Sequence, residues 1–321
     1  MENFERRTND LGDNERLVLF LGTERGLQVM QRIVQDRIGE VAAVCVQYDT
    51  GYGAQASEEI ARVAKEAGAD VYSSNDVKST QYAELIRRYD ANTALCINWR
   101  KLFPMDAVNA AHRGLTVAHD SLLPHLRGFA PLNHSLRLGE NKTGVTLFYA
   151  AKETDSGDII GAKETAIGSD EYVREVRDRV TGLTVELVSE ELPRILAGRS
   201  VGSPQDESKA TFGVRLTPDD GRIDFSRTRR EIFNLIRATS HPYPGAFTGL
   251  EGREMRVWTA SLPEDTPVLA TTIPGRVVKR EENRGVFVSA GDGAILLENV
   301  EINGDNASAD AFIRNHSTTL K

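Results

Sequence analysis

The chain has 321 residues, which is enough for two domains of ordinary size. With 40% hydrophobic and 27% charged residues, its composition is that of a globular protein with a substantial core. No apolar run approaches the ~20 residues that cross a bilayer. A net charge of −8 argues against a nucleic-acid partner held by phosphate neutralisation.

The N-terminal residues alternate in charge and lack the apolar stretch of a secretory signal. We therefore expect residues 1–15 to form a flexible tail and the protein to be cytoplasmic.

Between residues 17 and 98, apolar runs alternate with helical patterns. Strands are predicted at 17–21, 40–48, 71–72 and 93–98, and helices at 27–35, 57–68 and 82–89. This alternation predicts an α/β fold with a doubly wound, parallel-type (Rossmann-like) sheet. The glycines at 22 and 26 do not make the dinucleotide fingerprint, so NAD is not expected. Cys45 and Cys96 lie inside apolar runs and are expected to be buried core thiols.

Residues 114–160 contain fewer helical patterns and more Pro, Gly, His and Asp. Loops beyond the carboxyl ends of parallel strands are where such sheets hold ligands. A long amphipathic helix is predicted to follow, capped near 169–170 and ending near 193–198. Its apolar residues form one buried stripe: Val173, Val176, Val180, Leu183 and Leu187.

The polar stretch 200–211, with Gly, Pro and Ser, is typical of a linker. Beyond it, short strands are predicted at 256–262, 275–280, 285–291 and 294–302, and a helix at 228–239. This pattern predicts a smaller, mainly β domain with an OB-like barrel. We therefore expect two domains, 16–204 and 205–321, and we find no internal repeat.

The block 119–160 carries a set of motifs at fixed spacing. They are His119, Ser121-Leu122-Leu123-Pro124, Arg127-Gly128, Pro131, Gly139-Glu140, Thr143-Gly144-Val145-Thr146 and Asp155-Ser156-Gly157-Asp158. This block closely resembles the signature of the folate-dependent formyltransferases. The stretch 210–247 looks like the opening of that family's C-terminal domain, so the resemblance runs from about residue 16 to about residue 303. Within the family, the chain looks most like the sugar-nucleotide branch, which includes the UDP-4-amino-4-deoxy-arabinose formyltransferases.

The resemblance implies transfer of a formyl group from 10-formyltetrahydrofolate to an amine. Such a transfer passes through an oxyanion, and it needs a hydrogen-bond donor and a proton carrier. A histidine beside a carboxylate can supply both, so His119 and Asp155 are the expected catalytic pair. Without the surrounding motif, a turn would be the preferred interpretation of Asp155–Asp158, and Arg127-Gly128 could be an ordinary loop.

The resemblance also implies binding residues. Contact with the folate is expected from Asn98, Arg100, Leu102, Phe103 and Asp158, although plain packing fits Leu102 and Phe103 equally well. Contact with the amine substrate is expected from Ser121, Leu122, Pro124, Arg127 and Gly128. No metal is expected, since there is no H-E-x-x-H motif, and a triad hydrolase is not expected, since there is no G-x-S-x-G motif.

One position departs from the family pattern Asn-x-His-x-Ser-Leu-Leu-Pro. Val117 stands where the Asn is expected, and valine cannot donate a hydrogen bond to the oxyanion. Another donor can replace it: Asn98, Asn133, Thr116 or a backbone N–H. Alternatively, the acceptor is a stronger nucleophile such as a hydroxylamine or hydrazine, or the chain binds folate and transfers poorly.

The acceptor amine remains open at this point. A methionyl-tRNA formyltransferase needs basic surface, yet residues 204–321 carry 15 Lys and Arg against 17 Asp and Glu, and residues 48–57 carry no Lys or Arg. We therefore expect a small-molecule amine, foremost a nucleotide-linked amino sugar, then a natural-product amine. The tRNA enzyme and a non-catalytic folate-binding homologue are the alternatives, and a homodimer is one option for assembly.

Overall fold

The computed structural model describes residues 15–48 and 54–321. Apart from Glu15, the predicted tail lies outside the described residues. The chain forms two compact units. The first comprises the residues up to Gly128, Gly144–Thr165 and Arg179–Gly213, and the second comprises Phe129–Thr143, Ala166–Asp178 and Val214–Lys321. Because the units interleave along the chain, the division at 204/205 stays a prediction.

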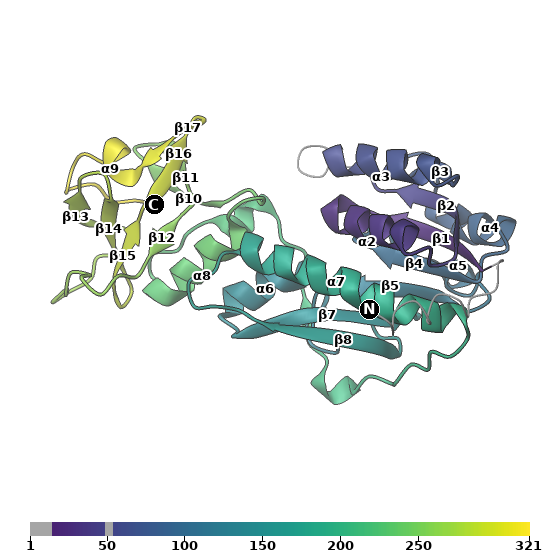
Figure 1. Ribbon diagram of the computed structural model, residues 1–321. Coiled ribbons are helices and arrows are strands. Elements are labelled where there is room, and N and C mark those ends of the chain that lie inside the picture. Colours follow the sequence, from purple (N-terminus) through teal and green to yellow (C-terminus); the bar gives the residue numbers. More distant parts are fainter. Residues whose placement is uncertain (1–14, 49–53) are drawn as a thin grey trace. The chain divides into compact units, whose positions relative to one another are not determined.

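The first unit is built on a seven-stranded sheet of order β3-β2-β1-β4-β5-β7-β8 (Figure 1). The strands are β1 (Arg16–Leu21), β2 (Glu40–Val46), β3 (Asp70–Ser73), β4 (Thr93–Ile97), β5 (Leu115–His119), β7 (Lys142–Tyr149) and β8 (Ile159–Ala166). The helices between them are α2 (Thr23–Gln35), α3 (Ala54–Glu66), α4 (Tyr82–Arg88) and α5 (Met105–Val108), with a 3-10 turn η1 (Ser79–Gln81).

The first five strands are parallel, and β7 runs antiparallel to β5. The predicted doubly wound, parallel-type sheet is confirmed, with an antiparallel extension. The chain moves outward from β1 to β3 and then returns to β4 on the other side of β1. The strand order therefore reverses between β1 and β4, and sheets of this kind bind ligands beyond the carboxyl ends of the strands at that point.

Both faces of the sheet are covered. On one face, the ring of Phe20 packs edge-on against Tyr82 and Phe103, with centroid distances of 5.1 and 4.9 Å. On the other face, α2 approaches so closely that a Cβ on Gly26 would lie 3.1 Å from Leu21 Cβ. This double covering is why β1 is a continuous apolar run.

Residues 114–160 are more regular than expected, since they contain β5, β7, part of β8, the short strand β6 (Arg127–Gly128) and helix α6 (Pro131–Leu138). Gly144 in β7 explains part of the difference. A Cβ at this position would lie 2.1 Å from the carbonyl oxygen of Lys163 in β8. Gly144 therefore marks the close approach of a neighbouring strand, where the composition indicated loops.

The long helix predicted from the apolar stripe is α7 (Val173–Leu196). Val173, Val176, Val180 and Leu187 are buried, and Leu183 is half-buried. The predicted stripe is confirmed.

Residues 200–213 are bound to the first unit, and the prediction of a linker at 200–211 is wrong. Ser203 and Ile159 exchange two backbone hydrogen bonds of 2.8 Å. Further on, a 3-10 turn η2 (Glu207–Lys209) precedes strand β9 (Phe212–Gly213), which pairs in parallel with β6.

The second unit contains mostly antiparallel strands in two four-stranded sheets, β10-β11-β16-β17 and β12-β15-β14-β13. Their bounds are β10 (Ala246–Leu250), β11 (Arg253–Val257), β12 (Ala260–Ser261), β13 (Val277–Glu281), β14 (Gly285–Ala290), β15 (Gly293–Leu297), β16 (Asn299–Ile302) and β17 (Asp305–Ser308). A 3-10 turn η3 (Pro218–Gly221), helix α8 (Arg229–Thr239) and helix α9 (Ala309–Phe312) complete it. A mainly β second part is confirmed.

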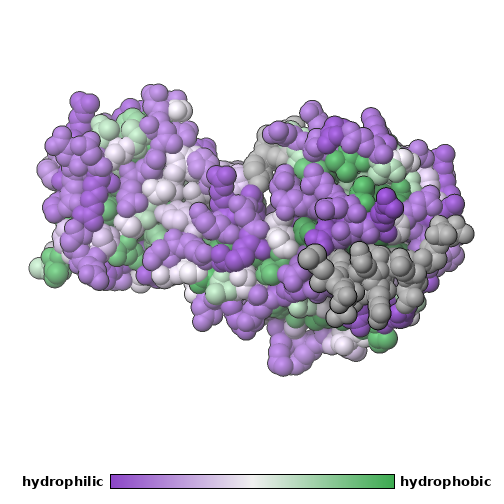
Figure 2. Space-filling view, viewed as in Figure 1, coloured by the Kyte–Doolittle hydropathy of each residue, from purple (hydrophilic) through white to green (hydrophobic). Residues whose placement is uncertain are grey.

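The visible surface is mainly hydrophilic, with hydrophobic side chains in scattered patches (Figure 2). Within the part of the chain that the structure describes, none of the helices combines the length and the apolar character that crossing a membrane requires.

The two cysteines are buried and unpaired by disulfide, as predicted. Burial raises the pKa of the Cys45 thiol to about 12, and burial also raises the pKa of Cys96. The thiolate is the reactive form, so at pH 8 only about one Cys45 in 10⁴ is reactive. We expect native protein at pH 8 to react with iodoacetamide at least ~10²-fold more slowly than protein unfolded in guanidinium, as measured by mass spectrometry. Equal rates in the two states would show that the thiols are accessible.

Candidate functional site

Three strand ends meet at the carboxyl edge of the sheet. The register pairs Leu21 with Ile97, and Ile97 with Ala118. The residues that follow these positions, Gly22, Asn98 and His119, are therefore neighbours across β1, β4 and β5. This edge adjoins the reversal in strand order between β1 and β4, where a ligand site is expected.

His119 is the last residue of β5 and is 9% exposed. Its Nδ1 lies 3.6 Å from Asp155 Oδ2, and its Nε2 lies 2.8 Å from the carbonyl oxygen of Leu126. A carbonyl oxygen only accepts, so Nε2 must carry the hydrogen. In the neutral ring, Nδ1 therefore holds the lone pair beside the carboxylate, and a protonated ring would place a cation there. The structure thus brings the two predicted catalytic residues together.

Asp155 is fixed by the backbone around it. The N–H of Gly128 donates to Asp155 Oδ2 over 2.7 Å. Asp155 itself has a φ of +52°, a conformation that residues other than glycine rarely adopt. Two residues later, a Cβ on Gly157 would lie 1.7 Å from the carbonyl oxygen of Tyr149, so only glycine fits this turn.

Arg127 is a buried arginine whose guanidinium is bonded to side chains of the protein's own segment 205–207. Its guanidinium donates to both carboxylate oxygens of Glu207 over 2.7 and 2.9 Å, and to Gln205 Oε1 over 2.8 and 3.1 Å. The bonds between Arg127 and Glu207 hold the pKa of Glu207 below its usual value and raise the pKa of Arg127. Gln205 and Glu207 were missed by sequence reasoning because the stretch containing them has the composition of a linker.

A second buried arginine lies at the same edge. Arg25, in the first turn of α2, donates to Asp120, to Asn98 Oδ1 over 3.1 Å, and to Thr181 Oγ1 over 3.2 Å. Asn98 has a φ of +51° and donates from Nδ2 to Thr23 Oγ1 over 3.1 Å. Arg25 was also missed by sequence reasoning, although its position between the two glycines that follow β1 placed it at the ligand-binding edge.

The other predicted binding residues differ in how deeply their side chains are buried. Ser121 is buried and donates to the carbonyl oxygen of His125 over 2.6 Å, while Leu122 and Pro124 are half-buried. Phe103 packs in the aromatic cluster with Phe20, whereas Leu102 is 75% exposed. Arg100 and Asp158 are exposed.

The structure also places the residues considered as substitutes for the missing Asn. Val117 lies on the same side of β5 as His119, and it packs against the core cluster below α4 and α5. Thr116 is fully buried on the other side and donates to the carbonyl oxygen of Ala94. Asn133 belongs to the second unit, where Nδ2 donates to the carbonyl oxygen of Ala238 over 2.8 Å. Of the three side chains considered as substitutes, Asn98 alone follows the end of the strand next to β5, beside His119.

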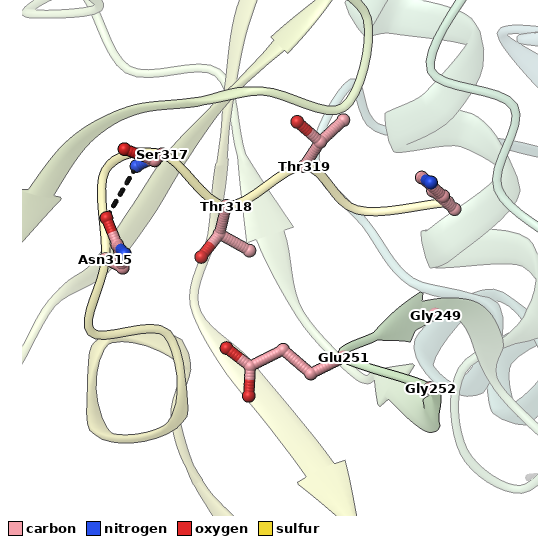
Figure 3. Close-up of a pocket in the computed structure, with 8 residues that line it drawn as sticks. Gly249, Glu251, Gly252, Asn315, Ser317, Thr318 and Thr319 are labelled. Atoms are coloured by element: carbon pink, nitrogen blue, oxygen red, sulfur yellow. Dashed lines mark hydrogen bonds between the residues drawn. The ribbon is translucent and has the colours of Figure 1, made fainter.

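Across residues 15–48 and 54–321, no three His, Cys, Asp or Glu side chains gather in a way that could hold a metal ion. The second unit has a pocket of about 450 Å³ lined by Gly249, Glu251, Gly252, Asn315, Ser317, Thr318, Thr319 and Lys321 (Figure 3). In it, the N–H of Ser317 donates to Asn315 Oδ1 over 2.8 Å. Glu251 and Lys321 are the ionisable side chains of the lining, and it contains no histidine that could carry a proton near pH 7. The edge with His119 and Asp155 is therefore the candidate active site.

The fold resembles those of solved N-formyltransferases. It matches the N-formyltransferase from Helicobacter canadensis in complex with folinic acid and dTDP-3-aminofucose with a TM-score of 0.67 and 16% identity, over 88% of this chain and 98% of that one. It matches HypX from Aquifex aeolicus in complex with tetrahydrofolic acid with a TM-score of 0.62 and 18% identity, over 94% of this chain and 47% of that one. At these identities, the likeness shows a shared fold.

Sequence comparison is more specific. The chain is 31% identical over 284 residues to the methionyl-tRNA formyltransferase of Bacillus subtilis (strain 168), covering 87% of this chain and 88% of that protein. It is 29% identical over 290 residues to the corresponding protein of Geobacter sulfurreducens, covering 89% of each. Residues 16–192 match the formyl transferase family, and residues 215–317 match the formyl transferase C-terminal domain. The chain therefore belongs to the formyl transferase family and is an enzyme that transfers formyl groups.

Proposed function

We propose that this enzyme moves a formyl group from 10-formyltetrahydrofolate to the amine of a small molecule, foremost a nucleotide-linked amino sugar. A natural-product amine or hydroxylamine is the next acceptor class. The observation that carries the proposal is the 3.6 Å approach of His119 Nδ1 to Asp155 Oδ2 at the carboxyl edge of the sheet, in a chain of this family.

The segment after β4 suits the folate donor. Leu102 and Met105 are 75% and 41% exposed there, and they offer apolar side chains against which an aromatic ring can pack. Phe103 supports the same segment from the core. We assign Leu102, the backbone around Asn98 and the exposed Arg100 and Asp158 to the donor.

The hydrogen bond at Nε2 of His119 decides which ring nitrogen can carry the proton in the proposed reaction. With Nε2–H held by Leu126, Nδ1 is free to take the proton of the attacking amine as the nitrogen bonds to the formyl carbon. Asp155 then stabilises the imidazolium. When the bond from that carbon to the folate nitrogen breaks, the same proton moves from Nδ1 to the departing nitrogen. One formamide and one folate N–H result, so atoms and protons balance.

The oxyanion needs a donor other than His119 Nε2–H, because that hydrogen is bonded to Leu126. We assign this role to Asn98. Its Oδ1 accepts from Arg25, which fixes the orientation of the amide, and one of its two Nδ2 hydrogens goes to Thr23. The other hydrogen can point to the reacting carbonyl.

The charges from residue 204 onward support a small acceptor over tRNA. From residue 204 onward the net charge is −2, from 15 Lys and Arg against 17 Asp and Glu. Many of these cations are already neutralised by carboxylates of the same unit. The ion pairs are Arg227 with Asp224 and Glu231, Arg229 with Asp292, Arg253 with Glu251, Arg256 with Glu254, Lys279 with Glu281, Arg280 with Asp310, and Arg284 with Asp265 and Glu281. A phosphate backbone would have to compete with these carboxylates for the same cations.

The second candidate function is formylation of methionyl-tRNA, which the identity to the Bacillus subtilis protein favours. The lack of Lys and Arg at 48–57 counts against it, although residues 49–53 lie outside the described residues.

The assay that tests the proposal offers 10-formyltetrahydrofolate with nucleotide-linked amino sugars, N-hydroxylated amino acids or methionyl-tRNA, and measures tetrahydrofolate release. We expect release with a small amine and none with methionyl-tRNA. Release with methionyl-tRNA alone would establish the second candidate. Tight folate binding without release for any acceptor would identify a non-catalytic folate-binding protein.

His119→Ala and Asp155→Asn each remove one partner of the catalytic pair. We expect each to lower kcat by about 10²–10⁴-fold, because proton transfer in the transition state contributes that much. The matched control is His112→Ala, since His112 is an exposed histidine paired with Asp90. Steady-state kinetics on folded protein measures the effect, and retained activity in His119→Ala would refute the assignment.

Asn98→Asp keeps an oxygen for Arg25 and removes the amide donor. We expect kcat to fall by about 10²–10³-fold, the usual loss for one oxyanion donor, with little change in KM. The exposed Asn75→Ala provides the control. Unchanged kcat in Asn98→Asp would assign the donor role to a backbone N–H.

A further inference from the structure

We propose that Gln205 is a positioning residue that holds Asp155 in place through the turn that carries it. This inference rests on the proposed function of Asp155 and identifies the residue on which the geometry of that carboxylate depends.

Gln205 binds the Asp155 turn with its amide nitrogen. Nε2 donates to the carbonyl oxygen of Asp155 over 2.8 Å and to that of Gly157 over 2.7 Å, so both amide hydrogens are used on one turn. This turn contains the positive φ of Asp155 and the glycine at 157 that admits no side chain. A backbone held in a sparsely populated conformation needs such external contacts to persist.

Gln205 is itself oriented by Arg127. Its Oε1 accepts from Arg127 Nε over 3.1 Å and from Arg127 Nη2 over 2.8 Å. An oxygen that accepts from a buried guanidinium cannot exchange places with the amide nitrogen, because two donors would then face each other. Arg127 therefore fixes which end of Gln205 faces the turn.

The contacts close into a ring around the carboxylate. Arg127 N–H donates to the carbonyl oxygen of Thr211 in the pairing of β6 with β9, and the next residue, Gly128, donates to Asp155 Oδ2 over 2.7 Å. Gln205 thus joins the backbone of Asp155 to the same strand that binds its side chain. Displacement of either end misplaces the oxygen that faces His119 Nδ1, and misplacement of about 1 Å can cost ~10² in rate.

Two substitutions at Gln205 distinguish its contacts with the Asp155 turn from its contacts with Arg127. Gln205→Ala removes all the contacts, whereas Gln205→Glu still accepts from Arg127 but cannot donate to the turn. We expect both to lower kcat by about 10–10²-fold with KM for both substrates changed by less than about threefold. Lys209→Ala is the matched control, since Lys209 lies on the same segment with a 74% exposed side chain. Near-normal kcat in Gln205→Glu would overturn the proposal.

A double-mutant cycle tests whether Gln205 acts through Asp155. In the Asp155→Asn background, we expect Gln205→Ala to lower the residual kcat by less than about twofold, because residues that act as a unit are not additive. A full additional loss in that background would show an independent role and overturn the proposal.

Hydrogen exchange gives a readout that does not depend on the reaction. We expect the Gly128 amide, whose acceptor is the Asp155 carboxylate, to lose at least ~10-fold protection in Gln205→Ala and none in Lys209→Ala. Unchanged protection would overturn the role of Gln205. Lost protection with unchanged kcat would support that role and refute the catalytic use of Asp155.

Discussion

The register between β5 and β7 is the constraint on which the candidate active site depends. It pairs His119 with Thr146, and the turn after β7 then brings Asp155 back to the end of β5. Side chains alternate between the faces of a strand, so a slip of one residue would carry His119 to the opposite face. The site therefore exists only because buried residues on both sides of this sheet fix the register.

The sequence predicts the parts of this fold that bury a continuous apolar surface. β1 is apolar at every position from 17 to 21 because helices cover both its faces, and α7 shows its stripe because one side of it is buried. The approach of His119 to Asp155 was also predictable, since both residues belong to motifs at fixed spacing.

Contacts between distant polar residues were not predictable from composition. Residues 200–211 were expected to form a linker, yet polar groups of this stretch are the partners of Arg127, Leu126 and Asp155. A polar residue that satisfies a buried group looks the same in sequence as one that faces water, because only the fold decides what it meets. The contacts of Arg25 could not be predicted for the same reason, and Arg25 is not part of the dinucleotide fingerprint that the neighbouring glycines were tested for.

These contacts bear on the absence of the Asn that the family pattern places at position 117. An asparagine at this position would lie on the side of β5 that carries His119, where Val117 instead adds apolar packing against the core. At the end of the adjacent strand, Asn98 is held by Arg25, whose charge is balanced by Asp120, the residue directly after His119. A buried arginine requires a carboxylate partner such as Asp120. The pair of Arg25 and Asp120 forms only while the ends of the strands stay aligned. An amide side chain is thus present one strand away from Val117, in a cluster that ties α2, β4 and β5 together at the edge where the chemistry is proposed.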